Sequence, residues 1–313
     1  MVVRELRRSD GREYLAVMQR GFPDESVMMG VRPEEFEKIF ERAFRWDTRL
    51  ILGFLGLIGR PLVRPLLVEA DGHVVATTMV TFSAHSAYVS NVVVDAPYRR
   101  RGLARQLLEE ARRSARKAHR TYISLDVLET NTPARTLYES LGYRVLRTQT
   151  RLGRDLSTGT RPAPSPTPGI RPFEKGDASG LVEIVHRHAN PTVEEVTPTG
   201  KGRFIQSGMV TRILNSENAA WVVDRGNGPE AHVGATVSAA YEAAFMSNAV
   251  LAESVEPDVA RSLIATAVAW CAARNAPRVH TFVDDTDARG RAALEANGFT
   301  NVRALRTLYR TVD

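Results

Sequence analysis

The segment Val92–Ala104 combines residue types that could bind a phosphate group. It reads Val-Val-Val-Asp-Ala-Pro-Tyr-Arg-Arg-Arg-Gly-Leu-Ala, a β-branched run that leads through a basic turn into a helical pattern. The first N–H groups of a helix are unpaired and carry partial positive charge, and a glycine lets an anion approach the backbone closely. Arg99, Arg100 and Arg101 stand directly before Gly102. This combination predicts a phosphate or pyrophosphate site at a helix start; the alternative is a solvated basic turn.

Elements on both sides of this turn would hold it in place. Tyr88–Val94 is rich in valine and is typical of a central strand that is buried on both faces. Leucines and alanines recur at helical spacing over residues 101–118, with charged residues opposite them, which predicts an amphipathic helix. Asp71-Gly72 is a strong hairpin signal between strands at 65–70 and 73–82.

The remaining patterns complete one layered domain. They predict strands at Val2–Leu6, 122–127 and 143–152, and helices at 11–21, 33–45 and from Thr132-Pro133 to Gly142. This order predicts an α+β fold, a mixed α/β layer in which helices cover a largely antiparallel sheet.

A proline-rich stretch divides the chain. Residues 154–169 hold Pro162, Pro164, Pro166 and Pro168 and predict an extended linker between domains at 1–153 and 170–313. Three landmarks of the first part return in the same order 156 or 157 residues later: Ser90-Asn91 as Ser247-Asn248, Leu107-Leu108 as Leu263-Ile264, and Tyr138–Tyr143 as Leu294–Phe299. The repeated spacing predicts a duplicated domain.

The basic turn also resembles a known family signature. Arg99-x-x-Gly102-x-Ala104 after a hydrophobic strand is similar to the acyl-CoA motif of the GNAT superfamily of N-acetyltransferases. Leu125–Tyr143 is similar to the family's other hallmark, an asparagine after a strand, then a helical tyrosine, then glycine and an aromatic residue. The resemblance covers essentially residues 1–153 and implies two tandem GNAT-like domains, each with a splayed central sheet, and acetyl-CoA as the co-substrate.

The resemblance implies a set of cofactor-binding residues. The strands Tyr88–Val94 and Tyr122–Val127 would splay apart around the pantetheine arm. Backbone groups of Val92, Val93 and Val94 would hold that arm and polarise the thioester carbonyl. Asn131 would contact the arm from the far side. The pyrophosphate would be held by amides of the basic turn: Arg99, Arg100, Arg101, Gly102, Leu103 and Ala104.

Two side chains are the implied catalytic residues. Tyr138 matches the family's tyrosine that protonates the leaving CoA thiolate, although its position on an apolar helix face also suits a core residue. A free lysine amine has a pKa of about 10.4, so a base that removes its proton is useful. Asp126 stands twelve positions before Tyr138, where one branch of the family carries a glutamate that is one methylene longer. Glu129, Asp24 and Glu25 are the other candidate bases.

The second copy lacks these features. At the positions of the basic turn it reads Val255-Glu-Pro-Asp-Val-Ala260, with two carboxylates and no glycine. Leu294 stands in place of the tyrosine and Asp287 in place of the asparagine. We therefore expect residues 170–313 to keep the fold and to lack a CoA site.

Composition limits the remaining possibilities. The chain of 313 residues has a net charge of +6, 43% hydrophobic and 25% charged residues, and a single cysteine, Cys271. These values exclude long disorder, internal disulfides and cysteine zinc clusters. The histidines show no metal-ligand spacing, so no metal is expected. Nothing near Met1 has the pattern of a secretion signal, so we expect a cytoplasmic protein. The apolar segment 50–59 is about half the length of a membrane span.

Three hypotheses for function follow. The first is a tandem acetyltransferase that moves acetyl from acetyl-CoA to a primary amine of a small molecule or peptide, by direct attack in a ternary complex. The second is a non-catalytic acyl-CoA-binding module. The third is a basic nucleic-acid-binding protein, but the basic stretch Arg112–Arg120 lacks interleaved aromatic residues, so we expect no stable nucleic-acid complex. We expect a monomer built as an internal pseudo-dimer, with a homodimer as the alternative.

Overall fold

The computed structural model describes residues 2–22, 63–157, 167–205, 215–238, 241 and 243–313. The predicted helix 33–45, the apolar segment 50–59, and the carboxylates Asp24 and Glu25 lie outside these ranges. The chain forms two compact units. The first comprises Met1–Leu146 together with Arg306–Asp313, and the second comprises Arg147–Leu305.

The first unit is built on a mixed sheet. Its strands lie in the order β1-β2-β3-β4-β5-β13. All neighbours from β1 to β4 are antiparallel, and β4 and β5 are parallel. The predicted hairpin at Asp71-Gly72 is confirmed, and both residues have positive φ (55° and 81°), as this tight turn requires. The strands are β1 (Val2–Glu5), β2 (Val63–Ala70), β3 (His73–Phe82), β4 (Ser86–Val94), β5 (Tyr122–Leu128) and β13 (Thr300–Thr311).

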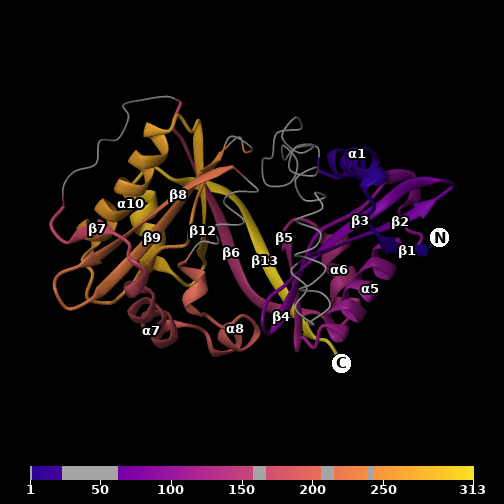
Figure 1. Ribbon diagram of the computed structural model, residues 1–313, viewed down its shortest axis with the longest axis horizontal. Coiled ribbons are helices and arrows are strands. Elements are labelled where there is room, and N and C mark those ends of the chain that lie inside the picture. Colours follow the sequence, from indigo (N-terminus) through magenta and orange to yellow (C-terminus); the bar gives the residue numbers. More distant parts are fainter. Residues whose placement is uncertain (1, 23–62, 158–166, 206–214, 239–240, 242) are drawn as a thin grey trace. The chain divides into compact units, whose positions relative to one another are not determined.

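Helices cover both faces of this sheet (Figure 1). One face packs against α1 (Gly11–Gly21), which contacts β3 and β4. The other face packs against α5 (Leu103–Lys117), with α6 (Thr132–Ser140) next to it. The apolar stripe of α5 enters the core, where Leu107 and Leu108 are buried with Ile123 and Leu125 of β5. The amphipathic spacing in the sequence is the reason that this face of α5 turns inward.

The last strand of each half of the sequence contributes to the other compact unit. Leu308 and Val312, near the C-terminus, are buried in the core of the first unit. Most of β6 (Arg144–Asp155) belongs to the second unit, where Leu152 is fully buried and the strand pairs antiparallel with β12 (Arg278–Asp284). The compact units therefore differ from the predicted boundaries, because residues 147–153 lie in the second unit and residues 306–313 in the first. Arg154 and Asp155, predicted as linker, are paired strand residues opposite Val279 and Arg278.

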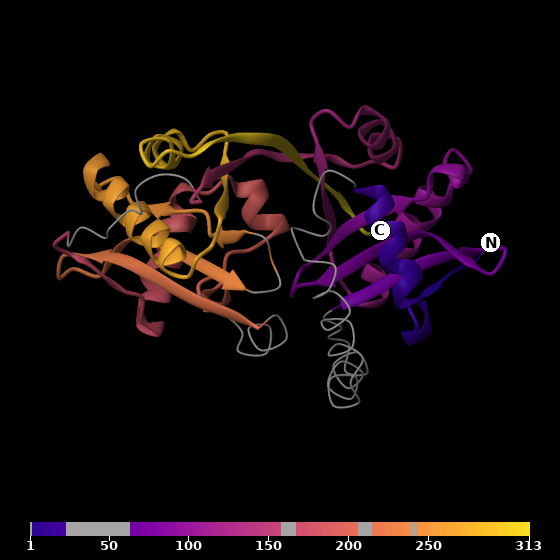
Figure 2. The same ribbon diagram turned by 90° about the horizontal axis from the view of Figure 1, so that it is seen from above.

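The second unit repeats the architecture of the first. Its strand order is β6-β12-β10-β9-β8-β7, with β10 and β12 parallel and β11 paired with β9. Figures 1 and 2 show α10 on one face of this sheet and α7 on the other. The further elements are β7 (Ile170–Pro172), α7 (Ala178–His188), α8 (Pro191–Val196), β8 (Ser216–Asp224), β9 (Pro229–Ser238), β10 (Ala244–Met246), β11 (Val250–Leu251), α10 (Pro257–Ala273) and α11 (Ala288–Glu295).

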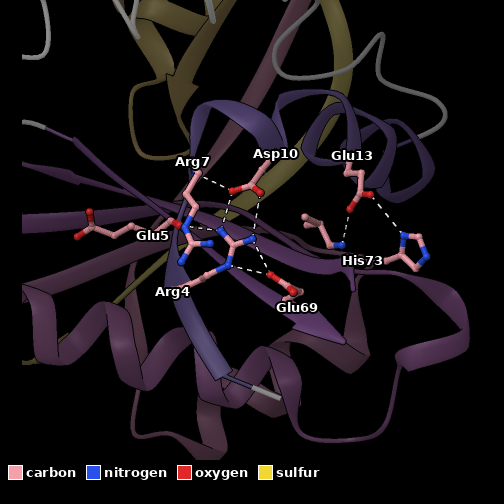
Figure 3. A network of polar contacts seen from close by, with 8 residues as sticks. Arg4, Glu5, Arg7, Asp10, Glu13, Glu69 and His73 are labelled. Carbon is pink, nitrogen blue, oxygen red and sulfur yellow. Dashed lines mark hydrogen bonds and ion pairs between the residues drawn. The ribbon is translucent and has the colours of Figure 1, made fainter. Parts of the chain in front are cut away.

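A polar network supports the inferred duplication. In the first unit Arg4 forms a bidentate pair with Asp10, at 2.6 and 3.0 Å, and binds Glu69 at 2.7 Å (Figure 3). In the second unit Arg171 forms a bidentate pair with Asp177, at 2.9 and 2.8 Å, and binds Asp224 at 2.7 Å. In each unit the network ties the first strand to the start of the first helix. The same arrangement at equivalent positions is what a duplicated domain predicts.

Candidate active site

The central strands of the first unit splay apart where the sequence predicts a cofactor. The parallel pairing of β4 with β5 runs from Ser86 opposite Tyr122 to Val89 opposite Leu125, and it stops there. Beyond that point β4 has a register shift against β3, and Asn91 adopts a positive φ of 56°. Such a bulge bends its strand and increases its twist. Among the described residues, the backbone of β4 after Val89 therefore has no partner strand on the β5 side.

The backbone amides of the three valines after the bulge point to different edges of β4. Val93 is opposite Thr77 of β3, and the following amide of Asp95 donates to Val75 of β3. Because backbone groups alternate between the two edges of a strand, the amides of Val92 and Val94 face the β5 side, whereas that of Val93 faces β3. The carbonyl of Val94 accepts a hydrogen bond from Nε of Arg99 at 3.0 Å. Of the three predicted contacts, the strand geometry thus favours Val92 and Val94 for a ligand in the gap, and Val93 for packing.

The basic turn forms a concave row of donors before α5. Arg100 and Gly102 both have positive φ, 63° and 79°. The first helical hydrogen bond runs from Gln106 to the carbonyl of Gly102. No acceptor within the described residues engages the six successive amides from Arg100 to Arg105. Amides that converge in such a nest at a helix start attract anions.

The turn is also tied to α1. Arg20 donates two hydrogen bonds to Asp95, at 3.0 and 2.7 Å, and these bonds hold the pKa of the Asp95 carboxyl below its usual range. Asp95 in turn caps the short 3₁₀ helix Ala96–Tyr98 through the amide of Ala96. The guanidinium of Arg101 lies 5.1 Å from the centre of the Tyr98 ring. These contacts fix the approach of the chain to Gly102.

Asp126 is held by two hydroxyl groups from neighbouring strands. Its Oδ2 accepts a hydrogen bond from Tyr88 of β4 at 2.9 Å, and its Oδ1 accepts one from Thr307 of β13 at 2.7 Å. Asp126 follows Leu125, the last residue of β5 that pairs with β4, so its carboxylate lies where the strands begin to diverge. Both hydroxyls orient the carboxylate without neutralising it.

Tyr138 is a buried tyrosine of α6. It is 6% exposed, and burial raises the pKa of its phenol to about 12. Its ring packs against Tyr143 with the ring centres 6.0 Å apart. The hydroxyl of Tyr143 is buried without a partner, and that of Tyr138 donates to no described group. Tyr138 is therefore neutral at physiological pH and has a proton to donate.

Two other predicted residues have local roles in the structure. The side-chain oxygen of Asn131 accepts the amide of Ala134 at 3.2 Å and so caps α6. The helix begins at Thr132, directly after this cap. The amide nitrogen of Asn131 donates to no described group and so could bind another partner. Glu129 pairs with Arg306, at 2.5 Å, and with Arg135, at 3.6 Å, so it is a poor candidate base.

Sequence reasoning missed Tyr88 and Thr307 as partners of Asp126. The parallel register of β4 and β5 places Tyr88 next to Asp126, but a register cannot be read from the sequence of either strand. Thr307 belongs to a strand that the sequence assigns to the other half of the chain. No local signal marks its exchange into the first unit.

The equivalent positions of the second unit carry different chemistry. Ala244 and Phe245 pair with Val279 and His280 in the same register as Ala87 and Tyr88 with Ile123 and Ser124, which fixes the equivalence. The four residues of the first unit that could move or orient a proton are each replaced: Tyr88 by Phe245, Asp126 by Phe282, Thr307 by Arg151 and Tyr138 by Leu294.

The start of α10 in the second unit also differs from the start of α5 in the first. α10 begins at Pro257, which has no N–H, and its cap Glu256 pairs with Arg225. Arg289 of α11 donates to the carbonyls of Ala252 and Val255 just before the helix. The first unit has no proline and no ion pair at the equivalent helix start among its described residues.

Comparison with known proteins agrees with this geometry. Residues 27–143 match the profile of the Acetyltransferase (GNAT) family, so the first half of the chain contains a GNAT acetyltransferase domain. Members of this family are acyltransferases that use acyl-CoA. The chain as a whole shares its fold, over nearly the full length of both chains, with a solved tandem GNAT protein.

Three solved structures document the shared fold. A tandem GNAT protein from the clavulanic acid biosynthesis pathway is 15% identical, covers 100% of this chain and 98% of its own length, and has a TM-score of 0.65. A GCN5-related N-acetyltransferase from Sphaerobacter thermophilus is 16% identical, with 99% and 95% covered and a TM-score of 0.66. An acetyltransferase from Pyrococcus horikoshii is 13% identical, with 99% and 89% covered and a TM-score of 0.59.

A comparison with curated proteins found no match to the chain. Every helix of the described ranges is too short or too polar to cross a membrane. Over the same ranges, no group of His, Cys, Asp and Glu side chains is arranged to hold a metal ion.

Proposed function

We propose that the first unit is an N-acetyltransferase that moves an acetyl group from acetyl-CoA to a primary amine of a small molecule or peptide. The observation that carries this proposal is the row of six unpaired amides at the start of α5, directly beyond a strand pair that splays apart. A diphosphate offers many oxygen acceptors and negative charge, which suit this row and its three arginines. The unpaired edge of β4 suits an extended chain that carries amide groups.

The residues present fit the cofactor. Amides from Arg99 to Ala104 would hold the pyrophosphate, the edge of Val92 and Val94 would hold the pantetheine arm, and the free amide nitrogen of Asn131 would reach it from the other side. When bound, acetyl-CoA supplies an activated acetyl group. An N–H of the β4 edge would stabilise negative charge that develops on the carbonyl oxygen.

Asp126 would accept a proton and Tyr138 would donate one during the reaction. The carboxylate of Asp126, oriented by Tyr88 and Thr307, would accept a proton from the ammonium of the acceptor, directly or through a water. The phenol of Tyr138 stays protonated because burial raises its pKa to about 12. It would donate that proton to the sulfur that leaves. The neutral amine would attack the carbonyl carbon, the C–S bond would break, and the nitrogen would lose its second proton to the phenolate of Tyr138. The products would be an amide, free CoA and the restored phenol, with the first proton left on Asp126 or released to water.

We further propose that the second unit lacks a CoA site. Its helix start carries Glu256, Asp258 and Pro257, and like charges there would repel a diphosphate. Phe282 and Leu294 cannot transfer protons. The segment that follows this unit in the chain, residues 306–313, would complete the first unit with Thr307.

The test uses two tyrosines of one ring pair. Tyr138→Phe should lower kcat by about 100-fold to 10,000-fold, because it removes a general acid, while the Kd for acetyl-CoA stays unchanged. Tyr143→Phe is the matched control, since its hydroxyl has no partner to lose. Release of free thiol would be followed over a panel of amines. Equal rates for both variants would contradict the role of Tyr138. Tight acetyl-CoA binding with no turnover on any amine would instead favour a non-catalytic acyl-CoA-binding module.

A further inference from the structure

Two arginines of the second unit have no polar partner among the residues that the structure describes. Arg147 and Arg151 of β6 are only partly exposed, and the Nε atom of each is buried without an acceptor. Neither guanidinium has a hydrogen bond or an ion pair within the described part of the chain. Arg171 and Arg291 of the same unit, in contrast, are paired with carboxylates. Removal of a guanidinium from water is costly unless an acceptor replaces the water.

Both arginines point to the same face of the sheet. Leu152 of β6 is buried in the core beneath α10, so odd-numbered residues of this strand face the opposite side, on which α7 lies. Arg151 is opposite Phe282, and Gly153 is opposite His280. Arg147 and Arg151 are four positions apart, about 13 Å along the strand. They can meet one ligand whose oxygen atoms extend over several ångströms.

One further arginine and two histidines interact with these side chains. Arg203, beside α8, has its pKa lowered by desolvation and then by the charge of Arg147. Desolvation and then the charge of Arg151 lower the pKa of His280 to about 4. Burial, and then the charge of Arg203, lower the pKa of His232 to about 4. Both histidines are therefore neutral at physiological pH, and the positive charge near them comes from the arginines.

Nearby carboxylates are engaged elsewhere. Glu194 accepts the amide and the hydroxyl of Thr199, at 2.8 and 2.6 Å, and lies 3.2 Å from His186. Asp284, opposite Gln149, accepts the amide and the hydroxyl of Thr286. Neither carboxylate forms an ion pair with Arg147 or Arg151 among the described contacts. The positive charge of the two arginines is left for another partner.

The same face has the opposite character in the first unit. There it carries Asp126 with its two hydroxyl donors, which suits an ammonium. In the second unit Arg151 takes the position of Thr307 and Phe282 that of Asp126, and the ring of Phe245 lies 6.3 Å from that of His280. We infer that this face of the second unit binds a small anionic molecule, through carboxylate or phosphate oxygens held by Arg147 and Arg151. Guanidinium groups suit such oxygens because they donate two parallel hydrogen bonds.

Thermal unfolding of the full chain tests the inference. Inorganic phosphate or citrate would be titrated into chloride buffer at constant ionic strength. We expect a saturable rise in Tm for the unmodified chain and none for Arg147→Met combined with Arg151→Met, where methionine keeps the apolar stem. In chloride alone the double variant should be at least as stable as the unmodified chain, because two unpaired charges are gone. Arg187→Met, on the exposed surface of α7, is the matched control and should respond fully.

A second variant keeps the test informative if the double variant does not fold. Arg151→Lys keeps the charge but not the paired donors, so the concentration of anion needed for half the rise should increase about tenfold. A response to citrate alone assigns a carboxylate ligand, and a response to phosphate alone assigns a phosphate. The inference is overturned if neither anion raises Tm, if the double variant responds as the unmodified chain does, or if it is less stable in chloride. The readout needs neither CoA nor an amine, so it is independent of the proposed acetyl transfer.

Discussion

A single charge placed at Gly102 should abolish most CoA binding. Gly102 adopts a φ of 79° at the end of the basic turn, and a Cβ built there meets no atom within 4 Å. A larger side chain is therefore accommodated in space, and its cost of about 1–2 kcal/mol comes from the backbone conformation alone. Glutamate and glutamine pay that cost equally, in the free and in the bound protein. Gly102→Glu and Gly102→Gln thus differ only by one negative charge beside the row of amides.

The size of the effect follows from Coulomb's law. A carboxylate about 5 Å from a diphosphate of two negative charges is repelled by about 2 kcal/mol in water and about 7 kcal/mol at an effective dielectric constant of about 20. Gly102 is exposed, so the lower value applies, which is about a 30-fold weaker affinity.

Calorimetry with CoA measures the difference. We expect the Kd of Gly102→Glu to exceed that of Gly102→Gln by about 30-fold at low salt, and the ratio to shrink at about 0.5 M salt, where charges are screened. Equal affinities for the two variants at low salt would refute the placement of the diphosphate, and with it the proposed function.

Three further predictions concern the elements around the site. A Cβ at Gly21 would lie 2.3 Å from Cγ1 of Val93, so Gly21→Ala should lower the free energy of unfolding by about 1–3 kcal/mol, and denaturant titration should show this loss largely relieved in combination with Val93→Ala. Thr307→Val removes one hydrogen bond to Asp126 and should lower kcat about tenfold without changing the KM for acetyl-CoA; an unchanged kcat would argue against a role for that carboxylate. Arg4 lowers the pKa of Asp10, so the stability due to this pair is present at neutral pH and lost as the pH falls below about 4; Asp10→Asn should therefore unfold more easily at pH 7, by about 1–3 kcal/mol, with a flatter acid profile than the exposed control Asp71→Asn.

Local sequence predicted much of this protein correctly. The helix Gly11–Gly21, the hairpin at Asp71-Gly72 and the strand of β5 have the expected positions. Each is specified by short-range chemistry: spacing of apolar residues, capping groups, or residues that tolerate a positive φ. The basic turn belongs to the same class, because arginines and a glycine before an amphipathic helix act through the backbone of that helix. Internal spacing likewise predicted the duplication, which the paired networks of Arg4 and Arg171 support.

The hydrogen-bond partners of Asp126 could not be predicted from the local sequence. Its partners come from β4 and β13, and their meeting depends on strand register and on which unit receives the last strand. β6 and β13 have similar alternating patterns, so either strand could complete either sheet. The burial of Leu308 and Val312 in one core and of Leu152 in the other settles the exchange.

Sequence alone thus determined the elements, the repeat and the row of donors before α5, because these depend on neighbours along the chain. Tertiary structure decided that Thr307 reaches Asp126 and that Arg147 and Arg151 belong to the second unit. Those outcomes depend on apolar surface buried between distant segments, which no short stretch of sequence encodes.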